Sequence, residues 1–115
     1  MYTVTHDPIE VNAGEAVSIT FTVVDQAAVA VSVATATASY KIARKKGDTA
    51  ILTKTQAAGI TLASNTAVVA FDTASLVNAD ADQLYGEFIG QLTITKDGFD
   101  LVVAEGTISV APVVI

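Results

Sequence analysis

The sequence contains no cysteine and no tryptophan, and aromatic residues make up only 6% of its 115 residues. Without cysteine, the chain has neither disulfides nor thiolate metal ligands, and its redox compartment is not revealed. Because large side chains are scarce, the core must be built mainly from alanine, valine and threonine. Few large anchors remain for a ligand pocket, so we expect no small-molecule substrate.

Basic residues are also scarce, with six against twelve acidic ones and a net charge of −6. Such a charge repels phosphate backbones, so we expect no nucleic-acid partner. No apolar run reaches the roughly 18 residues of a membrane-spanning helix, and Met1–Thr3 does not begin like a secretory signal peptide. We therefore expect no membrane partner and a single domain over residues 1–115, long enough to bury one core.

Alternating apolar and polar residues are the main structural signal in the chain. In Ala16–Asp25, Val17, Ile19, Phe21 and Val23 fall on one face and serine or threonine on the other, which is typical of a half-buried strand. The same alternation recurs in Thr35–Arg44 and predicts a second long strand. Shorter strands are predicted at Tyr2–Thr5 and Ile9–Val11, on either side of Asp7-Pro8, and at an edge in Ala50–Thr55. Ala27–Ala34 predicts either a loosely paired edge or a crossing between sheets.

Two dipeptides predict tight hairpins whose register can be written down. Ser64-Asn65 and Asp97-Gly98 each stand between alternating segments, and Asp-Gly suits the positive φ values of a primed turn. The turn chemistry and the apolar pattern favour the same register in both cases. The expected pairs are Ile60 with Val69, Leu62 with Ala67, Leu92 with Val103 and Ile94 with Leu101. The apolar members Ile60, Val69, Leu92, Ile94, Leu101 and Val103 should be buried.

The remaining segments complete the predicted architecture. The apolar parity changes after Val103, which predicts a bulge or sheet switch at Glu105-Gly106. Thr73–Leu84 interrupts the alternation, and Asp72 or Thr73 could cap a single helical turn there. About seven short strands with frequent turns predict an all-β, antiparallel immunoglobulin-like β-sandwich. The missing Cys…Trp…Cys framework excludes an antibody domain.

Acidic motifs are the candidates for catalysis or metal binding, and each has a simpler explanation. Asp48-Thr49-Ala50 and Asp72-Thr73-Ala74 invite comparison with aspartic proteases, but a shared-proton dyad needs two symmetric loops. Asp80-Ala81-Asp82 offers fewer oxygen ligands than the six to eight that calcium prefers. His6 is the single histidine and has no partner ligand nearby in sequence. We expect no catalytic residue, no metal, no cofactor and no enzymatic activity.

Two segments are candidates for contact with a partner protein. Arg44, Lys45 and Lys46 form a basic turn that could bind an anion or an acidic partner, or could be a solvated tip that discourages edge pairing. The apolar C-terminal residues Val113, Val114 and Ile115 could pack against a neighbouring protein or could complete the last strand over their own core.

Several strand motifs together resemble a known family. They are Val17–Asp25, Ala34–Ile42, Gly59–Leu62, Val69–Phe71 and the Lys96–Gly98 turn. In this combination the chain is similar to the immunoglobulin-like N-terminal domain of tailed-phage baseplate upper proteins. It departs from that family in the loop after Asp25, which lacks the usual glycine, and in having no fibre or receptor-binding region after Ile115.

The resemblance implies a non-enzymatic building block of a tailed-bacteriophage virion, assembled in the host cytoplasm. Such a subunit would be a capsid-decoration, neck or tail/baseplate component. Its partners would be other virion proteins, in a multi-copy assembly. The alternative is a bacterial or phage surface binding module of carbohydrate or adhesin type. Carbohydrate sites usually present exposed aromatic rings, and the chain has few aromatics to spare.

Overall fold

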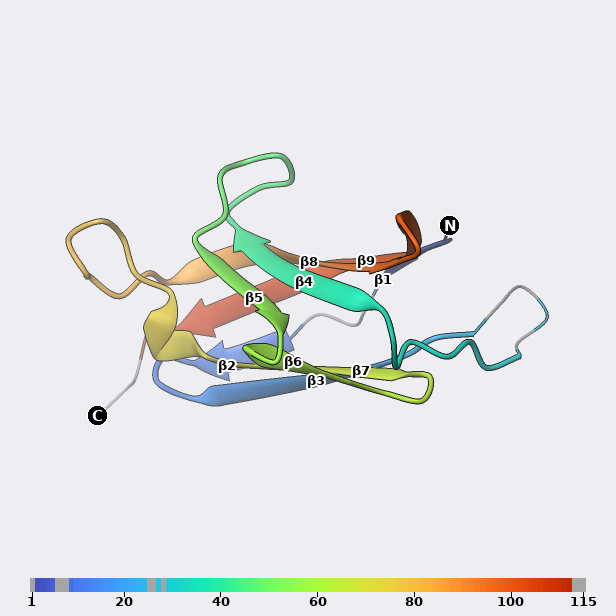
Figure 1. Ribbon diagram of the computed structural model, residues 1–115. Coiled ribbons are helices and arrows are strands. Elements are labelled where there is room, and N and C mark those ends of the chain that lie inside the picture. Colours follow the sequence, from blue (N-terminus) through green and yellow to red (C-terminus); the bar gives the residue numbers. More distant parts are fainter. Residues whose placement is uncertain (1, 6–8, 25–26, 28, 113–115) are drawn as a thin grey trace.

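In the computed structural model, the described residues are 2–5, 9–24, 27 and 29–112, and for 2–5 and 99–103 only the backbone is described. This part of the chain forms nine strands and one short 3₁₀ helix (Figure 1). It contains no helix that is long and apolar enough to cross a membrane. The elements are β1 (Tyr2–Thr5), β2 (Ile9–Asn12), β3 (Ala16–Thr22), β4 (Thr37–Ala43), β5 (Leu52–Gln56), β6 (Gly59–Ala63), β7 (Thr66–Asp72), η1 (Thr73–Ser75), β8 (Gly86–Lys96) and β9 (Phe99–Ala111).

The strands follow one hydrogen-bonded path, β1-β9-β8-β4-β5-β6-β7-β3, with β2 also paired to β9. Figure 1 shows two layers, one containing β4, β8 and β9 and the other β3, β6 and β7, with β5 passing between them. The all-β prediction is confirmed, but the seven-strand antiparallel sandwich is wrong. The nine strands form a mixed arrangement. β1 and β2 each pair parallel with β9, and β5 pairs parallel with β6.

The predicted edge strand is also placed differently by the structure. β5 lies between β4 and β6 in the strand order and joins the two layers. Its link to β6 passes through Ala57 and Gly59, with φ values of 65° and 111°. The chain therefore turns sharply without reversing into a hairpin. Of the two predictions for Ala27–Ala34, a crossing between sheets fits, because this segment leads from β3 in one layer to β4 in the other, and the bridge between Ala30 and Val24 is isolated.

The core lies between the two layers and follows the predicted alternation. The four apolar residues predicted to face inward from Ala16–Asp25 are all buried, and so are the alternating apolar residues of β4. The Tyr40 ring is fully buried and lies 6.1 Å from the Phe71 ring and 6.4 Å from the Phe21 ring, measured between centroids. Burial raises the pKa of the Tyr40 phenol well above its usual value. The core therefore centres on this one tyrosine and on aliphatic side chains from both layers.

The Ser64-Asn65 hairpin forms as predicted. Ile60 pairs with Val69 and Leu62 with Ala67. The turn is anchored to the neighbouring crossing segment, because the Val33 N–H donates to the Ser64 carbonyl at 2.7 Å. Ile60 and Val69 are buried, which confirms the predicted inward face.

The Asp97-Gly98 turn is confirmed, but the register beyond it is not. Both residues have positive φ, 55° and 83°, as a primed turn requires. A bulge between Ile94 and Thr95 then shifts the pairing by one residue. Ile94 consequently pairs with Val102, and Leu92 with Ala104, in place of the predicted Leu101 and Val103.

The bulge explains the parity change that the sequence shows in this hairpin. The predicted bulge at Glu105-Gly106 is wrong, since both residues pair regularly with β8. The shift occurs nearer the turn and brings the even-numbered Ala104, Ile108 and Val110 into the core. Leu92 and Ile94 are buried as predicted. The side chains of Leu101 and Val103 lie outside the described residues.

Candidate functional site

A basic pocket lies under the loop that connects β4 and β5. Three lysines line it, together with Asp48 and the outward face of β8, and its volume is ≈ 340 Å³. Because Lys41 pairs with Gln91 across β4 and β8, the sheet places its ammonium-bearing side chain beside the loop lysines. The lining residues are Lys41, Ala43, Lys45, Lys46, Gly47, Asp48, Thr49, Ala50, Ile89 and Gln91. In an acidic chain, this pocket gathers half of the six basic residues around one hollow.

The lysines of the pocket differ in how they are engaged. The Lys46 ammonium forms an ion pair with Glu105 on β9, at 3.4 Å. This pair crosses from the loop to the sheet, so Lys46 helps to hold the loop over β8 and β9. Lys41 and Lys45 are exposed, and neither forms an ion pair with another described residue. They are therefore the charges best placed to meet an anionic group from outside.

Arg44, the first residue of the predicted basic turn, is directed away from the three lysines of the pocket. Its Nη1 atom donates hydrogen bonds to the carbonyl oxygens of Tyr85 at 2.6 Å and Glu87 at 3.2 Å. The guanidinium carbon lies 4.2 Å from the centre of the Phe88 ring, which is within the range of a cation–π contact. Arg44 thus fastens the chain leading into β8 to the end of β4. The structure brings Lys45 and Lys46 together with Lys41, and Arg44 has a contact set of its own.

The Asp72-Thr73-Ala74 motif has a structural role in the described chain. The Asp72 carboxylate accepts a hydrogen bond from the Ala74 N–H at 2.9 Å and caps η1, as one of the two predicted caps. Thr73 is fully buried, and its hydroxyl donates to the Glu15 carbonyl at 2.8 Å. This buried contact ties η1 to the turn between β2 and β3. Asp48 lies on the basic loop, so its surroundings do not match those of Asp72.

The Asp80-Ala81-Asp82 loop is organised by Asn78. The Asn78 side-chain oxygen accepts hydrogen bonds from the N–H groups of Asp80 at 2.9 Å and Asp82 at 3.0 Å. Nearby, the Gln83 amide donates to three backbone carbonyls, including those of Thr73 and Leu76. Within the described ranges, no three histidine, cysteine or acidic side chains gather where they could hold a metal ion.

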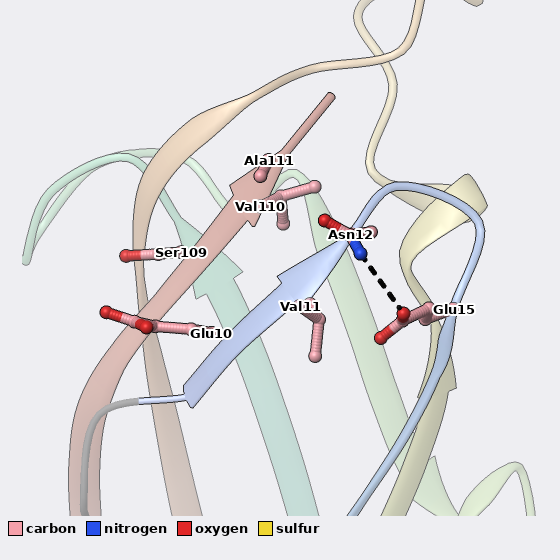
Figure 2. Close-up of a pocket in the computed structure, with 7 residues that line it drawn as sticks. All are labelled: Glu10, Val11, Asn12, Glu15, Ser109, Val110 and Ala111. Atoms are coloured by element: carbon pink, nitrogen blue, oxygen red, sulfur yellow. Dashed lines mark hydrogen bonds between the residues drawn. The ribbon is translucent and has the colours of Figure 1, made fainter. Parts of the chain in front are cut away.

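A second hollow, of ≈ 460 Å³, lies beside the ends of β2 and β9 (Figure 2). Two glutamates line it. Figure 2 shows Glu10 beside Ser109, its register partner on β9, whereas Glu15 lies on the other side of β2. The Asn12 amide donates to the Glu15 carboxylate at 3.5 Å. The two carboxylates are therefore not directed at one common point, and the hollow shows no arrangement for general acid–base chemistry.

Sequence reasoning identified part of the basic pocket and missed the rest. It named Lys45 and Lys46, but Gln91 and Ile89 come from β8 and could be added only once the β4–β8 pairing was known. The signal for Lys41 was its place on the outward face of an alternating strand. His6 and the candidate contacts Val113, Val114 and Ile115 lie outside the described residues. The role of Arg44, Lys45, Lys46, Val113, Val114 and Ile115 as partner contacts stays a prediction.

Comparison with known proteins bears on the fold. No protein-family model matches the chain, and no curated protein matches it. Among solved structures, it is similar to a protein from Bacteroides vulgatus ATCC 8482 described as a "putative glycoside hydrolase", with a TM-score of 0.53 and 16% sequence identity. The match covers 92% of this chain and 17% of the other. The chain therefore has an all-β fold that also occurs as a small part of a much longer chain.

Proposed function

We propose that this protein is a non-enzymatic structural subunit of a tailed-bacteriophage particle, assembled in the host cytoplasm and present in several copies. Its strand motifs, which resemble the immunoglobulin-like domain of phage baseplate upper proteins, supply the phage context. The observation that carries the docking role is the basic pocket formed by Lys41, Lys45 and Lys46 on an acidic body.

The proposed partner is an acidic segment of another virion protein. An aspartate or glutamate side chain is small enough to enter the pocket, and its carboxylate would meet the exposed ammonium groups of Lys41 and Lys45. Opposite charges at the rim of an interface speed association and select the partner, and salt weakens them. The uncharged floor at Ala43 and Ile89 can pack against the stem of the entering side chain. The pocket therefore offers both charge and shape to a protein ligand.

Charge reversal in the pocket tests this docking role. We expect Lys41→Glu combined with Lys45→Glu to reduce incorporation into particles about tenfold, because two attractions of up to about 1 kcal/mol each become repulsions. Both side chains are exposed, so the melting temperature should stay close to that of the wild type. The measurement is the number of copies per purified particle from phage carrying the variant gene.

The matched control for this experiment is Lys54→Glu. It reverses a charge on β5, outside the residues that line the pocket. Normal incorporation of the control together with loss of the double variant supports docking through the pocket. Wild-type incorporation of the double variant would remove the pocket from the interface.

A carbohydrate-binding module is the second candidate, favoured by one observation. Tyr85 is 44% exposed and is the exposed aromatic side chain among the described residues. Its neighbourhood is held in place by the hydrogen bond from Arg44 to its carbonyl. Aromatic rings stack on sugars, but carbohydrate sites usually use more than one ring. Glycan binding that is lost in Tyr85→Ala would favour this candidate over the structural one.

A further inference from the structure

The basic pocket is accompanied by two carboxylates of the chain itself. Asp48 lines the pocket together with Lys41, Lys45 and Lys46. The carboxylate of Glu105 on β9 lies 3.4 Å from the Lys46 ammonium. Three ammonium groups and two carboxylates leave a formal charge of +1 in and around the pocket. This charge matches one carboxylate ligand and is too small to neutralise a doubly charged one.

The sheet register places Glu105 at the border of the pocket. Lys41 on β4 pairs with Gln91 on β8, and Gln91 pairs with Glu105 on β9. Because neighbouring strands lie about 4.8 Å apart, the Cα atoms of Lys41 and Glu105 are separated by about 10 Å, with Gln91 between them. Lys41 is exposed, and Gln91 and Glu105 are half-buried on the same outward face. Glu105 therefore lies one strand beyond the Gln91 that lines the pocket.

The ion pair between Lys46 and Glu105 sets Lys46 apart from the other two lysines. The Lys46 side chain is 67% exposed and starts from the loop between β4 and β5, whereas the Glu105 side chain is 24% exposed and starts from a paired strand. Glu105 is therefore the more firmly placed of the two groups, and it holds the Lys46 ammonium on the β9 side. A single carboxylate ligand can meet Lys41 and Lys45 and leave this ion pair intact.

We propose that Glu105 makes the pocket selective for a single carboxylate side chain and disfavours doubly charged groups such as a phosphorylated side chain. The inference rests on the proposed function, because it specifies which acidic group of a partner the pocket accepts. A phosphoserine carries a charge of about −1.5 to −2 near pH 7. Its second charge would need the Lys46 ammonium, which Glu105 retains, and the phosphate would then lie near two carboxylates. Repulsion of the wrong ligand is a common source of specificity.

Two short peptides that differ at one position test this selection. One carries a single glutamate between glycines, the other carries a phosphoserine in its place, and both have blocked termini. Titration of the isotope-labelled, intact protein at constant ionic strength near pH 7 gives both dissociation constants from the amide NMR shifts of Gly47, Thr49 and Gln91. We expect the wild type to bind the phosphoserine peptide at most about twofold more tightly than the glutamate peptide.

Glu105→Gln removes one of the two carboxylates and releases the Lys46 ammonium. This variant should bind the phosphoserine peptide at least about fivefold more tightly than the glutamate peptide, because one attraction is gained and one repulsion is lost. Glu105→Gln combined with Lys46→Gln removes the released ammonium as well and should abolish this preference. The matched control is Glu15→Gln, which removes a carboxylate from the turn between β2 and β3, outside the residues that line the pocket. It should behave like the wild type.

Three results would overturn the proposal. They are a wild type that already prefers the phosphoserine peptide about fivefold or more, a Glu105→Gln variant that keeps the wild-type ratio, and the absence of shifts in the pocket with either peptide. The proposed function is tested separately, by incorporation into particles. The expected peptide selection together with normal incorporation of the Lys41→Glu and Lys45→Glu double variant would contradict the docking role alone. Lost incorporation of that variant together with an unchanged ratio in Glu105→Gln would contradict the role of Glu105 alone.

Discussion

Gly90→Ala is expected to destabilise the fold by about 3 kcal/mol, the upper end for overpacking a core. A Cβ atom at this position would overlap with the Oη and Cζ atoms of Tyr40. Tyr40 is fully buried between the layers, so its ring has nowhere to move. Gly90 pairs with Ile42 on β4, and its missing side chain leaves the space that the Tyr40 ring fills. Chemical denaturation monitored by circular dichroism measures the loss.

Two further variants test this reason for the effect. Tyr40→Phe removes the overlapping hydroxyl, so Gly90→Ala should cost less in that background than in the wild type. Thr93→Ala, on the outward face of the same strand, should stay within about 0.5 kcal/mol of the wild type. A free-energy change for Gly90→Ala as small as that of Thr93→Ala would contradict the packing of Tyr40 against β8.

Leu92→Ala is expected to lower the free energy of unfolding by about 2–5 kcal/mol. Leu92 is fully buried and pairs with Tyr40 on one side and Ala104 on the other. The loss combines the transfer energy of the missing methyl groups with the cavity left among neighbours that cannot close it. Urea unfolding measures the change, and an unchanged m-value would show that the denatured state is unaffected.

The control for this prediction is the neighbouring residue on the opposite face. Gln91 lies next to Leu92 on β8 but faces outward, where it lines the basic pocket. Gln91→Ala should therefore change stability by about 0.5 kcal/mol or less. Equal losses for Leu92→Ala and Gln91→Ala would mean that the inward face of β8 has been assigned incorrectly.

Local patterns in the sequence predicted the strands and both tight turns, but not every pairing. The Ser64-Asn65 register was correct because turn length and apolar parity agreed along the whole hairpin. In the Asp97-Gly98 hairpin they agreed as far as Val103, but the apolar parity changed beyond it, and a bulge at either of two places could account for that change. The structure places it beside Ile94. This choice brings Ala104, Ile108 and Val110 into the core, and packing against the other layer is a tertiary requirement.

The parallel β5–β6 pair could not be predicted, because nothing in Ala57-Ala58 signals the positive φ that turns the chain there. The candidate site was only partly visible for a similar reason. A run of basic residues marked Lys45 and Lys46, whereas the pocket also depends on the pairing of Lys41 with Gln91. Arg44 belonged to the same run in sequence, but the Phe88 ring and two carbonyl groups hold it elsewhere.

Counting this protein in purified phage particles tests the proposed function most directly. Quantitative mass spectrometry of particles purified from infected cells gives its copy number relative to the major capsid protein. A structural subunit in a multi-copy assembly predicts a fixed ratio, with several copies per particle, that survives washing at moderate salt. Absence from purified particles, with the protein left in the soluble fraction of the lysed host, would contradict the proposed function.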